Sequence, residues 1–186
     1  MNVLPQLEIG LLNGWLFFAL YLVVFGITMK SCPPTVRRRL YDRSLWSRRT
    51  KLLTVIGKMF SLLNILMIIF GVLVLENIEF NAGSVLYLLG LVILIRGIID
   101  YRDAPLNEPI TVGLYKYSRN PQILGVFVAF LGMVLVIGSW INVVFLIIAV
   151  IFSHFSILGE EFSLEQQYGE SYLQFKKKIP RYFLFF

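Results

Sequence analysis

Five long apolar stretches, separated by polar segments, decide what this chain of 186 residues can fold into. Each approaches the roughly 20 mainly apolar residues that an α-helix needs to cross a bilayer. The runs are continuous and do not alternate with polar residues, so they indicate helices and not the strands of a membrane barrel. The stretches are Leu11–Met29, Leu52–Leu75, Gly83–Ile99, Ile123–Gly138 and Ile141–Leu158.

The composition excludes an ordinary soluble domain. Hydrophobic residues make up 58% of the chain and charged residues 15%, whereas soluble domains average about 45–50% and about 25%. A chain of this size cannot hide so much apolar surface in one soluble core. We therefore predict an all-α integral membrane protein with five transmembrane helices and a single membrane domain, residues 1–186. Its three N-terminal spans and a basic loop occupy residues 1–99, and a two-span hairpin with polar flanks occupies residues 100–186.

The basic residues predict the orientation of these spans. All but two of the 17 lysines and arginines lie between Lys30 and Lys51, between Asp100 and Gln122, or after Leu158. With five spans, these three segments fall on one side of the membrane, and the positive-inside rule makes that side cytoplasmic. We therefore expect the N-terminus outside and the C-terminus in the cytoplasm. We attribute the basic balance to topology and anionic lipids, and we expect no nucleic acid partner.

Two polar side chains inside the apolar stretches have structural interpretations. Asn64 lies near the middle of its stretch and is expected to hydrogen-bond a neighbouring helix. His154 is the only histidine. A lone histidine is a poor zinc site and Cys32 is the single cysteine, so no metal site is predicted. We expect His154 to pack or to form a hydrogen bond.

The two polar segments that flank the last pair of stretches are the candidates for chemistry. Two antiparallel spans return the chain to the face it left, so we expect Asn120 and Glu160 to meet at one membrane surface. Asn120 precedes Pro121, a sequence that is typical of the cap and first turn of a helix.

The second of these segments carries apolar residues at helical spacing. We predict a C-terminal amphipathic helix at the membrane interface, bent at Gly169. Its apolar face consists of Leu164, Tyr168, Tyr172, Phe175 and Ile179.

Taken together, the two segments resemble the isoprenylcysteine carboxyl methyltransferase family. TVGLYKYSRNPQILG, from Thr111 to Gly125, is similar to the family pattern TxGxYxxxRHPxYxG. EEFSLEQQYGESYLQFKKKIP, beginning at Glu160, is similar to EExxLxxxFGxxYxxYxxxVP. Asn120 stands where the pattern has histidine, and Ile123 stands where it has tyrosine.

The resemblance implies a membrane methyltransferase that uses S-adenosylmethionine. Its acceptor would be a lipidic or prenylated molecule that enters from the bilayer among the membrane lipids, with O-methylation of a carboxylate as the expected reaction. Relatives in bacteria and archaea imply the inner (plasma) membrane of a prokaryote, with the active site on the cytoplasmic face. The alternatives are a non-catalytic membrane scaffold on the same fold and a membrane reductase of the sterol-reductase type.

The site predicted from this resemblance draws on both segments. Arg119 is expected to orient a carboxylate nucleophile, because a planar guanidinium suits that geometry. Glu161 is the candidate base if the acceptor is an amine. Tyr168 and Tyr172 are expected to contact the substrate. The residues expected to bind the cofactor are Ile110, Thr111, Gly113, Leu114, Tyr115, Asn120, Gln122, Leu124 and Glu160.

Overall fold

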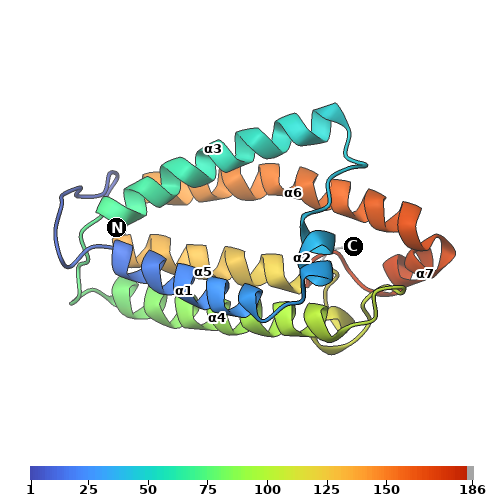
Figure 1. Ribbon diagram of the computed structural model, residues 1–186. Helices are drawn as coiled ribbons and strands as arrows, with labels where there is room; N and C mark the ends of the chain where they lie inside the picture. The colour runs from blue at the N-terminus through green and yellow to red at the C-terminus, as the bar shows by residue number, and fades with distance from the viewer. Residues whose placement is uncertain (184–186) are drawn as a thin grey trace.

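The fold, seen in a computed structural model that describes residues 1–183, is an elongated bundle of helices (Figure 1). The N-terminal segment lies at one end of the bundle, and α2 and α7 lie at the other. The elements in chain order are α1 (Trp15–Lys30), α2 (Pro34–Tyr41), α3 (Arg48–Phe70), α4 (Ile78–Asp103), the 3₁₀ helix η1 (Gly113–Lys116), α5 (Pro121–Ile137), α6 (Trp140–Tyr168) and α7 (Glu170–Lys178).

Each apolar stretch of the sequence coincides with one helix of the bundle. By length and composition, α3, α4 and α6 can cross a membrane. The apolar helices α1 and α5 are shorter, with 16 and 17 residues. The prediction of an all-helical protein is thus confirmed for residues 1–183, and three of its helices are consistent with membrane spans. The five-span arrangement and its orientation stay predictions.

The helices α4 and α5 touch at the level of their backbones because small residues line both sides of their contact. A Cβ atom at Gly90 would overlap the backbone of Ala129, and one at Gly132 would overlap the backbone of Tyr87. Small residues let membrane helices approach this closely. We call this contact the glycine seam, formed by Gly83, Gly90 and Gly97 of α4 with Gly125, Ala129 and Gly132 of α5.

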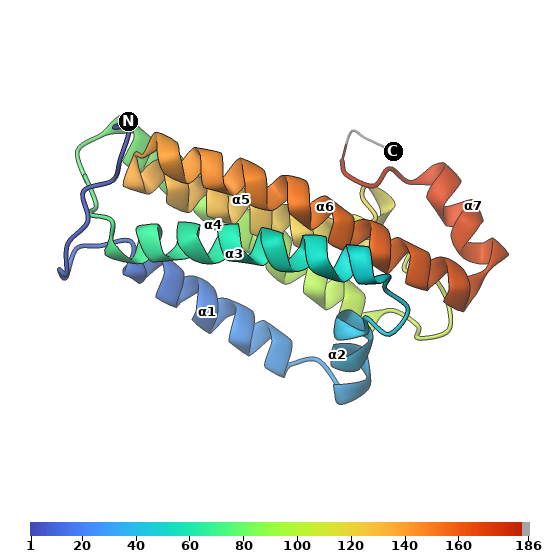
Figure 2. The ribbon, with the colours of Figure 1, turned by 90° about the horizontal axis from the view of Figure 1, so that it is seen from above.

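The helices α3 and α6 also run side by side (Figures 1 and 2), but larger side chains line their contact. Phe60 stacks on Phe152 with ring centroids 6.5 Å apart, and it meets Phe145 edge-on at 5.9 Å. We call these three rings the aromatic seam. Deeper in this pair, the amide of Asn142 donates a hydrogen bond of 2.8 Å to Asn64. This bond confirms the helix-bridging role predicted for Asn64.

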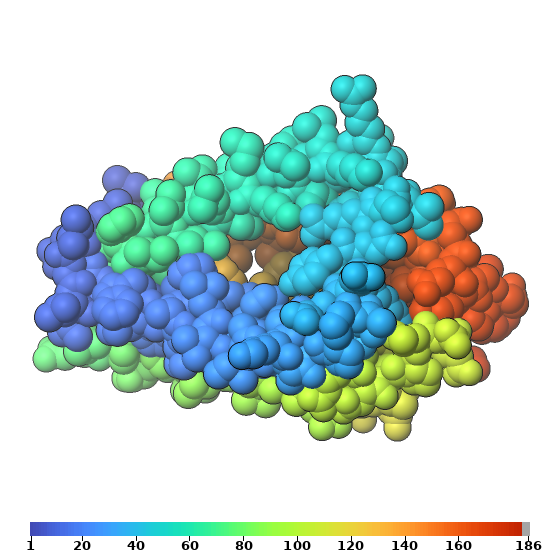
Figure 3. Space-filling view, viewed as in Figure 1, coloured from blue at the N-terminus to red at the C-terminus, as the bar shows by residue number. Residues whose placement is uncertain are grey.

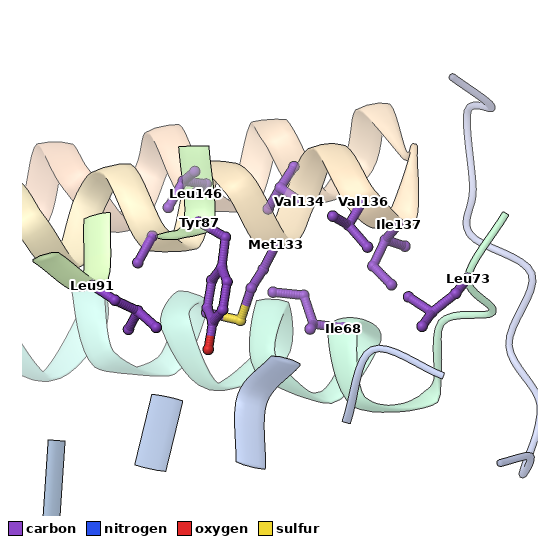
Figure 4. Close-up of a cluster of buried hydrophobic side chains, with 10 residues drawn as sticks. Ile68, Leu73, Tyr87, Leu91, Met133, Val134, Val136, Ile137 and Leu146 are labelled. Carbon is purple, nitrogen blue, oxygen red and sulfur yellow. The ribbon is translucent and has the colours of Figure 1, made fainter. Parts of the chain in front are cut away.

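The two helix pairs meet in a buried core near the N-terminal end of the bundle. There the side chains of Ile68, Tyr87 and Met133 come together from α3, α4 and α5 (Figure 4). Further along, a hollow of about 220 Å³ lies between the pairs, and Tyr21, Asn64 and Phe130 are among its lining residues. Figure 3 shows this hollow opening between α1 and α3.

The connection between α5 and α6 is as short as the sequence predicts. Gly138 has φ of 68°, a left-handed conformation that suits glycine, and it ends α5. Because α6 begins at Trp140, the two helices form a tight antiparallel hairpin. This hairpin carries the residues around Asn120 and around Glu160 back to the same end of the bundle.

Candidate functional site

A pocket of about 390 Å³ opens at the end of the bundle where α2, η1 and α7 gather. Its volume lies within the range of roughly 300–1,000 Å³ that is usual for small-molecule sites. We call it the end pocket. Its lining residues are Arg39, Leu40, Asp42, Leu45, Tyr101, Pro109, Ile110, Tyr115, Arg119, Asn120, Gln122, Glu160, Ser163, Leu164, Gln166, Gln167, Tyr172 and Phe175.

Both predicted segments contribute to this pocket. Asn120 and Glu160 lie in the same lining, which confirms that the hairpin brings them to one end. Of the predicted site residues, those that line the pocket are Ile110, Tyr115, Arg119, Asn120, Gln122, Glu160 and Tyr172. Those outside the lining are Thr111, Gly113, Leu114, Leu124, Glu161 and Tyr168. The roles assigned to all of these residues stay predictions.

Gly113 and Leu114 hold the loop after α4 against that helix. The carboxylate of Asp100, which is buried, accepts a hydrogen bond of 2.8 Å from the backbone N–H of Leu114. It also pairs with Arg96 at 3.0 Å. Gly113 has φ of 57°, and a Cβ atom there would overlap the Asp100 carboxylate. Only glycine therefore lets the loop come so close to Asp100.

Tyr115 places the amide of Gln122 in the pocket wall. Its phenol is buried and donates a hydrogen bond of 2.7 Å to Oε1 of Gln122. Its ring lies beside that of Tyr101, with centroids 6.3 Å apart. Burial raises the pKa of Tyr115 well above its usual value, so the phenol stays a neutral donor. Because Oε1 of Gln122 accepts this bond, its NH₂ group remains the donor that Gln122 can offer to a ligand.

Two arginines from distant parts of the chain share the buried carboxylate of Glu161. Arg119 approaches Oε1 at 3.1 Å, and Arg181 donates to both carboxylate oxygens at 2.9 and 3.0 Å. The bidentate bond to Glu161 raises the pKa of Arg181. We call these three residues the ionic triad. The triad ties the start of α5 to α6 and to the tail after α7.

One edge of the Arg119 guanidinium is left without a partner. The side chain is 2% exposed, and its Nη1 donates a bond of 3.0 Å to the carbonyl of Lys176. Within residues 1–183, however, the buried Nε–H of Arg119 has no acceptor at hydrogen-bond distance. Buried donors are almost always satisfied in native proteins. Because Arg119 lines the end pocket, this N–H suits an anionic group bound there.

The tail after α7 fixes the segment that precedes α5. The backbone N–H of Arg119 donates to the carbonyl of Pro180 at 3.0 Å. Asn120 stands at the cap position predicted for it, but its side chain does not cap the helix. Instead, its amide donates to the carbonyl of Arg181 at 3.3 Å, because the tail occupies the space beside it. Nδ1 of His154 lies 2.8 Å from the hydroxyl of Tyr182, so His154 forms a hydrogen bond, as expected.

The predicted C-terminal amphipathic segment is divided between two helices. Gly169, with φ of 54°, separates α6 from α7 and confirms the predicted bend. Tyr172 and Phe175 are buried and line the end pocket, so the apolar face of α7 contacts the protein there. Burial raises the pKa of Tyr172, whose phenol therefore stays protonated.

The basic segment between Lys30 and Lys51 supplies one wall of the pocket that the sequence did not predict. Arg39, Leu40, Asp42 and Leu45 of this segment line the pocket. The sequence also did not predict the contributions of Tyr101 and Asp100, at the end of α4. The spacing of Arg96 and Asp100 at i and i+4 was the one available signal for a local ion pair. Exposed arginines dominate the basic segment between Lys30 and Lys51, so its sequence pattern does not indicate the contact with the pocket.

Comparisons with known proteins point to one family. Residues 66–171 match the phospholipid methyltransferase family. A protein-S-isoprenylcysteine O-methyltransferase of Schizosaccharomyces pombe is 36% identical over 73 residues, which are 38% of this chain and 30% of that protein. The protein of the same name from Xenopus laevis is 28% identical over 121 residues, which are 64% of this chain and 39% of the relative. The chain thus spans less than half the length of either relative. No solved structure matches it.

Proposed function

The chain belongs to the phospholipid methyltransferase family, and we propose that it is an integral membrane methyltransferase that uses S-adenosylmethionine. The acceptor that we propose is a carboxylate on a lipidic or prenylated molecule, in keeping with the names of the two relatives. The observation that carries this proposal is the end pocket, where residues of both family-like segments line one cavity.

The pocket has groups that fit such a donor. When bound, S-adenosylmethionine supplies an electrophilic methyl group on a sulfonium. Glu160 lines the pocket and forms no ion pair within the described residues, so its carboxylate fits the donor's cationic groups or ribose hydroxyls. Gln122 and Asn120 present amides at the same wall. Ile110 and Tyr115 are buried beside them and offer apolar contact to a purine ring.

We assign the acceptor carboxylate to Arg119. Its unpartnered Nε can donate one hydrogen bond to an acceptor oxygen, which would fix the direction from which that oxygen attacks. A carboxylate needs no base, so the asparagine at position 120 is compatible with this reaction. Glu161 acts in this scheme by holding Arg119 and Arg181 in place. An amine acceptor would instead need a base, for which Glu161 is the candidate from sequence.

The proposed membrane placement follows the same argument. We propose five spans, with the basic segments and the end pocket on the cytoplasmic face of a prokaryotic inner membrane. The acceptor's apolar chain would enter from the bilayer. The hollow that opens between α1 and α3 (Figure 3) supports this route, because apolar side chains such as Val126 and Phe130 line it.

The test is a methyl-transfer assay in lipid nanodiscs. Protein is incubated with methyl-labelled S-adenosylmethionine and either an S-prenylated cysteine or phosphatidylethanolamine. A carboxyl methyl ester releases labelled methanol in base, whereas an N-methyl amine does not. We expect base-labile label on the prenylated cysteine, strongly reduced in Glu160→Gln and unchanged in Glu170→Gln, an exposed carboxylate of α7. Label that resists base on phosphatidylethanolamine would overturn the carboxylate assignment, and no label on either would overturn the enzyme assignment.

A further inference from the structure

The short helix α2 is fixed to the bundle in a way that aims one arginine at the end pocket. Cys32 and Val36 are buried against Met29, Leu94 and Ile98. This apolar contact seats α2 on the end of α4. Arg37 and Arg38 remain exposed, while Arg39 is half-buried and lines the pocket. Arg39 therefore has a different environment from the basic residues beside it.

The guanidinium of Arg39 joins three separate parts of the chain. It lies 5.0 Å from the ring centroid of Tyr101 on α4 and 5.4 Å from that of Tyr168 on α6. It also donates hydrogen bonds to the backbone carbonyls of Pro105 at 3.2 Å and Glu108 at 3.4 Å. A planar guanidinium can stack on rings and donate at its edge at the same time, and a lysine cannot.

Tyr168 supports the same loop from the other side. Its hydroxyl donates a hydrogen bond of 2.8 Å to the carbonyl of Leu106. Arg39 and Tyr168 thus hold carbonyls in a loop that has no helix of its own. Pro109 and Ile110, the next residues of this loop, line the end pocket. The position of this wall therefore depends on α2 and on α6.

We propose that Arg39 is a positioning residue that latches the loop between α4 and η1 over the end pocket. The Arg39 latch consists of Arg39, Tyr101 and Tyr168 with the carbonyls of Pro105, Leu106 and Glu108. Arg39 belongs to α2, which lies outside residues 66–171, the part of the chain that matches the family. The latch therefore holds one wall of the site from outside the matched part. Its effect on catalysis rests on the proposed function, but its effect on the loop does not.

The experiment reads the loop directly. Ala104 is 8% exposed, and Ala104→Cys places a thiol at the start of the loop, while the only native cysteine is buried. The rate at which a maleimide labels this thiol reports how often the loop opens. We expect Arg39→Ala and Arg39→Lys to speed labelling by about tenfold or more, a change that corresponds to losing two hydrogen bonds. Arg38→Ala, on the exposed side of α2, is the matched control and should label at the parent rate.

Tyr168→Phe keeps the ring beside Arg39 and removes only the hydroxyl, so it tests the latch with a smaller change in packing than Arg39→Ala. We expect labelling to rise by a few-fold, less than in Arg39→Ala. Parent labelling rates in both Tyr168→Phe and Arg39→Lys would overturn the proposal.

A second readout separates the latch from a role in folding or lipid contact alone. In the methyl-transfer assay, Arg39→Ala and Arg39→Lys should raise the KM for the donor more than they lower kcat. If Arg39 only set the topology, Arg39→Ala and Arg39→Lys would have the same KM and kcat as Arg38→Ala. This result would overturn a role of the latch in the site. A different result is that the parent protein transfers no methyl group while Arg39→Ala still speeds maleimide labelling at position 104. In that case the proposed function fails and the latch stands.

Discussion

The helices α4 and α5 touch backbone to backbone along the glycine seam, whereas larger side chains, the rings of the aromatic seam among them, line the contact of α3 with α6. The first contact leaves no room for a larger side chain, because a Cβ atom at its centre would overlap a neighbouring backbone. The second contact is made by larger side chains. Close packing is thus confined to the interior of each pair, and the hollow of about 220 Å³ lies between the two pairs.

The end pocket forms where these unequal pairs are joined. The tight pair supplies the loop after α4 and the start of α5, and the looser pair supplies the long end of α6. The ionic triad and the Arg39 latch bridge the two pairs at this end. The pocket therefore depends on polar links that hold two independently packed pairs together.

Removing the central carboxylate of the ionic triad should have the largest effect. In Glu161→Gln, Arg119 loses its charged partner while its side chain remains buried. Breaking a buried ion pair costs about 3–5 kcal/mol. We expect the free energy of unfolding, measured by denaturant titration in detergent, to fall by that amount. Glu170→Gln, at an exposed position of α7, is the control, and equal stability of the two variants would show that the buried ion pairs do not stabilise the fold.

Forcing a side chain into the glycine seam should have the next largest effect. Gly90→Val would push α4 away from Ala129, and overpacking of this kind costs about 1–3 kcal/mol. Gly26→Val on α1 is the matched control, because no atom lies within 4 Å of a Cβ atom there. The same unfolding titration checks both variants. A Gly90→Val protein as stable as Gly26→Val would show that the seam is not tight.

Two glycines with positive φ angles should respond differently to alanine. Gly113 has φ of 57° and Gly169 has φ of 54°, so each alanine carries a backbone strain of about 1–3 kcal/mol. Only at Gly113 does the Cβ atom also overlap Asp100, whereas nothing lies within 4 Å at Gly169. Gly113→Ala should therefore cost more stability and weaken binding of S-adenosylhomocysteine, while Gly169→Ala keeps its affinity. Calorimetric titration of both variants checks this, and equal affinities would argue against the fixed loop.

The aromatic seam should be the most tolerant. Phe60→Leu removes contacts with Phe145 and Phe152 that are worth about 0.5–1.5 kcal/mol, and the neighbouring side chains can move into the space. We expect a loss smaller than that of Gly90→Val, with Met59→Leu on the exposed face as control. A loss greater than that of Gly90→Val would reverse the comparison between the two pairs.

Hydropathy located the long helices because bilayer-length apolar runs are a local property of the chain. The ends of these helices depend on local hydrogen bonds, which a hydropathy pattern does not reveal. The second stretch was predicted over Leu52–Leu75, but α3 begins at Arg48, because Ser47 accepts a hydrogen bond from the N–H of Thr50. The same helix ends at Phe70, before Gly71.

The candidate site could be predicted only in part, for a related reason. The hairpin geometry sufficed to bring Asn120 and Glu160 together. The roles of Asp100, Arg39 and Arg181 depend on contacts between residues far apart in the chain. A single sequence carries no record of such contacts, and Arg39 has the same neighbours in sequence as a solvated arginine.

We expect the end pocket to bind the methyl donor where the two helix pairs are joined. The most direct measurement is calorimetric titration of S-adenosylhomocysteine into the protein in lipid nanodiscs. We expect binding that weakens about tenfold or more in Glu160→Gln and in Gln122→Ala, and that is unchanged in Glu170→Gln. Absence of binding to the parent protein, or equal affinity in all four proteins, would contradict it.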